Sequence, residues 1–159
     1  MKFPSRLSVC AIAALLAAAH PTLLRAATYP VDDRASTPYE SIGKMQWDAV
    51  APHRGANAAS TLSGHIMVQT RLDVRAWKHR MGRIYLTLQN LPLGPLSTSW
   101  TTRGRLLPGT VRAGERTLVY SGPIDTDVLE DELLLTIQAD GRRLVRTEQL
   151  NFSFEIDVN

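Results

Sequence analysis

Strict alternation of apolar and polar residues constrains the fold of this chain more than any other feature. In residues 150–158 the apolar positions are Leu150, Phe152, Phe154, Ile156 and Val158. Successive side chains of a β-strand point to opposite faces, so a period of two predicts a strand with one face in a core. Burying each such side chain stabilises a fold by about 1.5–3 kcal/mol. We therefore expect this strand to be essential to the domain.

The same alternation occurs in three earlier segments of the chain. These segments are residues 65–74, 84–89 and 98–105. The inward positions of the first are Ile66, Val68, Thr70, Leu72 and Val74. Those of the second are Ile84, Leu86 and Leu88, and those of the third are Thr98, Trp100 and Thr102. Further β-prone runs occur at 115–122 and 132–139, and Pro and Gly separate the runs. No stretch keeps a helical period, apart from one turn at 125–132.

The number and spacing of these runs predict the fold class. Seven or eight short strands with turn residues between them are typical of an antiparallel β-sandwich, immunoglobulin-like in broad architecture. The pair Asp140-Gly141 indicates a tight hairpin, because glycine adopts the positive φ that such turns need. A small closed β-barrel is the alternative.

The N-terminal residues predict export. Lys2 and Arg6 precede an uncharged apolar run at 7–19, and small residues follow at 26–27. This is the pattern of a secretory signal peptide, and the run is shorter than the ~20 residues of a membrane-spanning helix. We expect cleavage after Ala26 or Ala27, no transmembrane segment in the mature chain, and a periplasmic, secreted or cell-surface location.

The predicted domains follow from this cleavage. Residues 1–26 are the signal peptide, 27–61 are a loosely ordered lead-in with one strand near 44–50, and 62–159 are the core of a single β-sandwich domain.

Removing the signal peptide changes the charge and the cysteine content. The full chain has 18 Lys and Arg against 15 Asp and Glu, but Lys2, Arg6 and Arg25 leave with the signal, so the mature net charge is zero. We therefore expect no nucleic-acid partner. Cys10 is the only cysteine, so the mature chain has neither a disulfide nor a thiol nucleophile.

The mature charges are unevenly distributed along the chain. Residues 71–116 carry a net charge of +7, and residues 117–159 carry −6. One interpretation is that basic and acidic strands pair across a sheet. The other is a basic surface that binds an anionic partner through guanidinium forks and neighbouring aromatic rings. If residues 64–75, 83–90 and 97–106 share one sheet, this surface consists of Arg71, Arg75, Trp77, Arg80, Arg83, Arg103 and Arg105.

Two His-x-Met pairs suggest a different chemistry. His65 with Met67, and His79 with Met81, combine imidazole and thioether groups, which suit copper. Because residues i and i+2 of a strand share a face, one pair can reach one ion. The cations around His79 oppose this, so we expect no cofactor and keep copper handling as the alternative function. A hydrolase ranks third, because the sequence has no nucleophile elbow and no zinc-protease motif.

The alternation in 150–158 also resembles the C-terminal strand of chaperone–usher pilus subunits, which a chaperone binds by strand addition. The resemblance is local, and residues 27–43 do not alternate as the donor segment of such subunits does. Together these features predict an exported, non-catalytic envelope protein that acts by binding or assembly. Its expected partner is another envelope or appendage protein, or an anionic polysaccharide.

Overall fold

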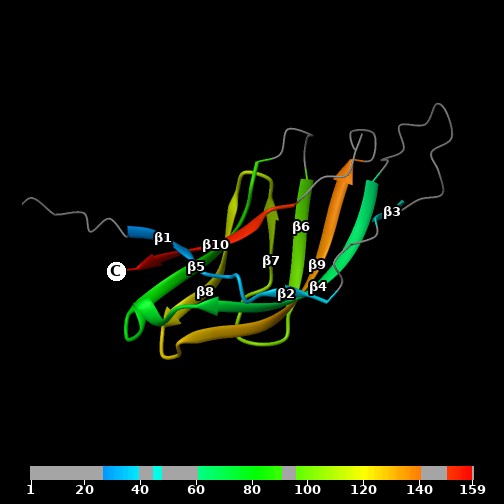
Figure 1. Cartoon of the computed structure of the whole chain (residues 1–159). Helices are drawn as coiled ribbons and strands as arrows, with labels where there is room; N and C mark the ends of the chain where they lie inside the picture. The colour runs from blue at the N-terminus through cyan, green and yellow to red at the C-terminus, as the bar shows by residue number, and fades with distance from the viewer. Residues whose placement is uncertain (1–26, 40–44, 48–60, 91–95, 141–149, 159) are drawn as a thin grey trace, which may run out of the picture.

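The computed structural model describes residues 27–39, 45–47, 61–90, 96–140 and 150–158 (Figure 1). Nearly all of this part is β-structure, and the sole helical element is one short 3-10 turn, η1. The elements are β1 (Ala27–Val31), β2 (Thr37–Pro38), β3 (Met45–Trp47), β4 (Thr61–Asp73), η1 (Arg75–Trp77), β5 (Met81–Leu88), β6 (Leu96–Thr102), β7 (Gly109–Arg112), β8 (Arg116–Pro123), β9 (Val128–Asp140) and β10 (Phe152–Val158).

Two antiparallel sheets pack together, so the predicted β-sandwich is confirmed and the closed-barrel alternative is not. The four-stranded sheet has the order β1-β10-β5-β8. The six-stranded sheet has the order β2-β4-β9-β6-β7, and β3 also pairs with β4. Figure 1 shows β4 and β9 as long curved strands that run side by side through the molecule.

The core lies between the sheets and contains the alternating residues that the sequence indicated. Leu72, Ile84, Leu88 and Ile156 are at most 1% exposed, and Trp100 is also buried. Phe154 and Val158 are buried, and Leu150 and Phe152 pack against the core at its margin. The inward and outward faces assigned from the period of two are therefore correct for these strands.

The strand β10 has a partner along both edges. It pairs with β5 from Phe152↔Leu88 to Val158↔Gly82, and with β1 from Ala27↔Val158 to Val31↔Phe154. A strand can be added to a sheet only at an edge with unpaired N–H and C=O groups. Strand addition of the kind suggested by the pilus resemblance would therefore require β1 to leave β10 first.

Two segments, 27–61 and 125–132, differ from the sequence-based expectation. Residues 27–61 were expected to hold one strand near 44–50, where β3 lies, but β1 and β2 also occur there. In β1 only Val31 is buried, so its alternation of apolar residues is too weak to be recognised. The expected helical turn at 125–132 is instead the start of β9, in which Leu129 and Asp131 point inward.

Some predictions lie outside the described residues. These are the signal peptide at 1–26 and the hairpin at Asp140-Gly141. Within the described ranges, no helix has the length and apolar character needed to cross a membrane.

Candidate functional site

The arginines that were expected to form one surface are divided between the two sheets. The strand β5, which carries Arg83, belongs to the four-stranded sheet, whereas β4 and β6 belong to the six-stranded sheet. The supposition that residues 64–75, 83–90 and 97–106 share a sheet is therefore wrong. The cause is topological: β9, from the acidic last third of the chain, lies between β4 and β6.

Three of the seven predicted residues, Trp77, Arg80 and Arg105, lie in connections between strands. Trp77 is half-buried against the core, and its ring centre lies 6.2 Å from that of Tyr29. The guanidinium carbon of Arg105 lies 5.9 Å from the ring centre of Tyr120. Arg80 lies in the connection between η1 and β5, where its carbonyl accepts a hydrogen bond from the N–H of Ile124.

Two predicted residues, Arg71 and Arg75, lie together at one end of β4. They line an open hollow of about 500 Å³, which we call the charged hollow; its lining residues are Asp32, Arg34, Ala35, Arg71, Asp73, Arg75 and Val128. Residues from β4, from β9 and from the segment between β1 and β2 meet here, although they are far apart in sequence.

Local hydrogen bonds hold the segment 32–36 against β4. The N–H of Asp73 donates to the carbonyl of Asp32 at 2.9 Å. The Ser36 hydroxyl donates to the carbonyl of Arg71 at 3.3 Å and accepts from its N–H at 2.8 Å. A backbone hydrogen bond from Ser36 to Asp33 at 2.8 Å closes the turn between them. These bonds fix the backbone that carries Asp32 and Arg34 beside Arg71 and Arg75.

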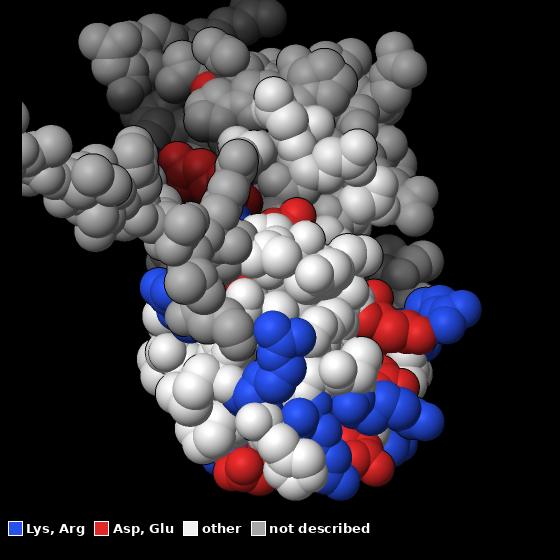
Figure 2. Space-filling view, turned by 90° about the vertical axis from the view of Figure 1, so that its left-hand side faces the viewer, with Lys and Arg blue, Asp and Glu red and all other residues white. Residues whose placement is uncertain are grey.

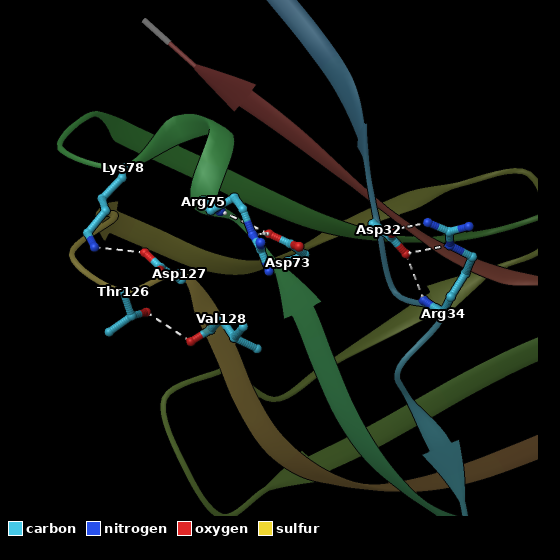
Figure 3. A network of polar contacts seen from close by, with 8 residues as sticks. All are labelled: Asp32, Arg34, Asp73, Arg75, Lys78, Thr126, Asp127 and Val128. Carbon is cyan, nitrogen blue, oxygen red and sulfur yellow. Dashed lines mark hydrogen bonds and ion pairs between the residues drawn. The ribbon is translucent and has the colours of Figure 1, made fainter.

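Each arginine of the charged hollow is held by one carboxylate (Figure 3). Arg75 donates from Nε to Asp73 Oδ1 at 3.0 Å, and Arg34 binds both oxygens of Asp32. In a third pair, which Figure 3 does not draw, Arg71 Nη2 lies 2.8 Å from Glu130 Oε1. The hydrogen bonds from the Arg34 side chain and N–H lower the pKa of Asp32 to about 2.

A further pair extends this row of charges. Lys78 Nζ lies 2.7 Å from Asp127 Oδ1, as Figure 3 also shows. The hydrogen bond from Lys78 lowers the pKa of the Asp127 carboxyl. Figure 2 views the side of the molecule at the left of Figure 1, and there the described basic and acidic side chains lie next to one another.

Cross-strand pairing of basic and acidic residues is confirmed, as one of the two interpretations predicted. Arg71 and Glu130 are register partners on β4 and β9, and Arg103 Nη1 lies 3.1 Å from Glu132 on the next outward position of β9. On the other sheet, Arg116 binds Asp157, and its guanidinium carbon lies 4.3 Å from the ring centre of Tyr85. The three arginines of the charged hollow are therefore balanced by Asp32 and Asp73 in its lining and by Glu130 next to it, and they do not form a field of one sign.

The geometry still leaves guanidinium groups available to a ligand. Arg75 contacts Asp73 through Nε, so the opposite edge of the guanidinium, which carries the two terminal amino groups, faces away from Asp73. The Arg75 side chain is 68% exposed. Arg71 uses one amino group and is 48% exposed. A planar guanidinium can bind one carboxylate along one edge and a second anion along another. The charged hollow can therefore present oriented donors to an anion while its own carboxylates hold the arginines in place.

The two His-x-Met pairs are separated in the structure. His65 is the register partner of Thr136, and its Nδ1 lies 3.1 Å from Thr136 Oγ1, whereas His79 lies beyond the opposite end of β4. His79 has a φ of 64° in the turn before β5. Among the described residues, no group of three or more His, Cys, Asp or Glu side chains is placed to hold a metal ion.

Sequence reasoning missed the part of the charged hollow that lies between β1 and β2, namely Asp32, Arg34 and Ala35, because 27–61 was interpreted as a loosely ordered lead-in. The segment Asp32-Asp33-Arg34 did contain a signal. Aspartate often accepts a hydrogen bond from the N–H two residues later, and here the N–H of Arg34 donates to Asp32 Oδ1 at 3.1 Å.

Comparison with known proteins found no relative of this chain. Neither a protein-family model, nor a curated protein, nor a solved structure matches this chain.

Proposed function

We propose that this protein is an exported, non-catalytic component of the cell envelope that binds an anionic polysaccharide at the charged hollow. The observation that carries the proposal is the position of Arg71 and Arg75, which lie on one open concave surface with their guanidinium groups held from one side. Export is supported by the signal-like pattern of residues 1–26.

The charge balance supports a polymeric ligand more than a small free anion. Each arginine must share its donors with an internal carboxylate, so a single contact with a ligand is weak, as exposed ion pairs usually are. Several weak contacts along one chain add through the high effective concentration of linked groups. A polysaccharide with a carboxylate or sulfate on each sugar provides such repeated contacts.

Binding to immobilised polysaccharides at low and high salt tests the proposal. We expect the mature protein to bind polygalacturonate or heparin and not dextran, which is neutral. Exposed charges are screened over about 8 Å at 0.15 M salt and about 3 Å at 1 M, so binding should be lost as salt rises. The double variant Arg71→Gln/Arg75→Gln should lose about tenfold in affinity or more, since two contacts of about 1 kcal/mol are removed.

A matched control separates a site from a general charge effect. The double variant Arg83→Gln/Arg112→Gln changes the net charge equally, but Arg83 lies on β5 and Arg112 on β7, outside the charged hollow. It should bind nearly as the wild type does. Equal losses in both double variants, or equal binding to dextran, would contradict the proposal.

A further inference from the structure

Two aromatic side chains, Tyr29 and Trp77, meet next to the charged hollow, and we call them the aromatic pair. Their ring centres are 6.2 Å apart and their planes are inclined by 41°. Tilted rings at about 4.5–7 Å attract each other. Because the two rings do not lie face to face, Trp77 leaves part of the Tyr29 ring uncovered, and Tyr29 is 44% exposed. The aromatic pair is therefore a partly open surface.

The aromatic pair and the charged hollow are carried by the same two segments of the chain. Asp32 and Asp73, which both line the hollow, form an antiparallel bridge. Tyr29 precedes Asp32 by three residues, and Trp77 follows Asp73 by four. The two segments thus run side by side from the hollow to the aromatic pair. Strand residues are spaced by about 3.3 Å, so Tyr29 lies roughly 10 Å along β1 from Asp32, a length that a short oligosaccharide covers.

The position of Tyr29 in its sheet explains why the ring is exposed. Tyr29 is the register partner of Ile156, which is fully buried. Directly opposite residues of paired strands share a face, so Tyr29 lies on the inward face of the four-stranded sheet. Of the residues of β1, however, Val31 alone is buried, so the core ends beside it. The ring of Tyr29 lies beyond the core, in contact with Trp77 and open to a ligand.

Backbone hydrogen bonds fix η1, which carries Trp77. The N–H of Val74 donates to the carbonyl of Asp127 at 2.9 Å. The N–H of Trp77 donates to the carbonyl of Val74, also at 2.9 Å. Arg75, the first residue of η1, and Lys78, the residue after it, are drawn in Figure 3. One backbone segment of fixed geometry therefore holds both an aromatic ring and a guanidinium, and such preorganisation lowers the cost of binding a ligand that contacts both.

We infer that the aromatic pair is a sugar-binding subsite of the charged hollow, at which one sugar ring of an anionic polysaccharide packs on Tyr29 while anionic groups of adjoining sugars bind Arg75 and Arg71. The C–H groups on one face of a pyranose ring form an apolar patch that fits an aromatic ring, and tyrosine and tryptophan provide such contacts at low entropic cost. The inference rests on the proposed function, and it adds the sugar ring to the charge as a feature that the site recognises.

Two polyanions, of which one lacks sugar rings, test the inference by calorimetric titration at low salt. Polygalacturonate carries its carboxylates on sugar rings, whereas poly-glutamate carries them on flexible side chains. We expect Tyr29→Leu in the mature chain to bind polygalacturonate about three- to tenfold more weakly than the wild type does, because leucine has no ring face. Its affinity for poly-glutamate should not change. Tyr29→Phe, which keeps the ring, should bind both polymers as the wild type does.

Tyr39→Leu is the matched control, because Tyr39 is also exposed, at 59%, and lies away from the aromatic pair. The N–H of Tyr39 donates to the carbonyl of Met67 at 2.9 Å. Met67 precedes Asp73 by six residues on β4, which is roughly 20 Å along the strand. Tyr39→Leu should change neither affinity. Melting temperatures of the three variants, compared with that of the wild type, show whether each is folded.

The indole N–H signals in NMR spectra give a second readout. The signal of Trp77, assigned with Trp77→Phe, should shift when trigalacturonate is added and not when triglutamate is added. The signal of Trp100 should shift with neither, because Trp100 is buried and its Nε1 donates to the carbonyl of Leu107 at 2.9 Å. A Trp77 signal that responds equally to both probes would contradict the recognition of a sugar ring.

Failure of the inference and failure of the proposed function give different results. If Tyr29→Leu binds polygalacturonate as the wild type does, or loses affinity for both polymers equally, the inference is overturned. The proposed function then still stands, provided that Arg71→Gln/Arg75→Gln loses affinity for polygalacturonate. If that arginine variant binds as the wild type does, or the wild type does not bind polygalacturonate, the proposed function is overturned and the inference with it.

Discussion

Asp131 and Asp73 are both aspartates near the end of a long strand, yet their surroundings differ completely. Asp131 points inward, is 8% exposed, and accepts hydrogen bonds from the backbone N–H groups of Arg103, Gly104 and Leu106 at 3.2, 2.7 and 2.7 Å. Asp73 lies at the surface and holds the exposed side chain of Arg75. We call the first region, residues 103–106 with Asp131, the Asp131 turn, and compare it with the charged hollow.

The difference lies in what each carboxylate fixes. Backbone N–H groups cannot move away without unfolding the turn, so the Asp131 turn is part of the fold. Glycine is required at Gly104, because a Cβ there would lie 2.9 Å from Asp131 Oδ1. A long arginine side chain, in contrast, can exchange its partner without any change in the backbone. Pairing with backbone therefore supports structure, and pairing with exposed cations leaves a surface that can bind.

The largest expected effect comes from placing an inward carboxylate where no donors surround it. Phe154→Asp replaces a buried core residue of β10 and should destabilise the domain by several kcal/mol, because an unpaired charge is buried. Urea denaturation of the purified variant measures the loss. Ser153→Asp, at the neighbouring exposed position, should lose less than about 1 kcal/mol. Equal stability of the two variants would mean that β10 is not packed in the domain.

Removing the carboxylate of the Asp131 turn should have the next largest effect. Asp131→Ala removes the acceptor of four backbone N–H groups, those of Arg103, Gly104, Leu106 and Glu132, and should destabilise the domain by about 2–4 kcal/mol in the same assay. Glu132→Ala removes the partner of the exposed Arg103 side chain and should cost less than about 1 kcal/mol. A small loss in Asp131→Ala would refute the structural role assigned to this carboxylate.

Acid should weaken the surface pairs over a defined pH range. The pKa of Asp32 is lowered to about 2, mainly by the Arg34 side chain, and the pKa of Asp127 is lowered by Lys78. Because the folded-state values lie below the ordinary value near 4, these groups contribute stability above pH 4 and lose it as the pH falls toward 2. Carboxyl chemical shifts between pH 1.5 and 6 should show Asp32 titrating last among these groups. An ordinary pKa for Asp32 would mean that the pair is absent in solution.

The sequence predicted the strands whose inward positions are large and apolar. Trp100, Ile84 and Phe154 are buried as the period of two requires, because a one-residue shift would expose every core residue of the strand. The sequence did not predict β1, in which Val31 alone is buried. That segment is a strand because it pairs with β10, and its own residue pattern does not indicate one.

The site was predictable only in part, for a topological reason. The sequence identified Arg71 and Arg75 but grouped them with Arg83, which lies on the other sheet. Strand order within a sandwich depends on contacts between distant segments, and alternation carries no information about neighbours. The insertion of β9 between β4 and β6 therefore placed Glu130 and Glu132 beside the arginines, and no local pattern indicated this arrangement.

Affinity for polygalacturonate in two single variants tests most directly whether the charged hollow binds anions in competition with its own carboxylates. Glu130→Gln releases Arg71 from its partner and removes one negative charge, whereas Arg75→Gln removes a donor. At low salt we predict that Glu130→Gln binds polygalacturonate about two- to fivefold more tightly than the wild type does, and that Arg75→Gln binds it more weakly. The melting temperatures of both variants should lie within a few degrees of the wild-type value, because exposed ion pairs contribute about 0–1 kcal/mol to stability. Equal affinity of all three proteins, or weaker binding by Glu130→Gln, would contradict the account.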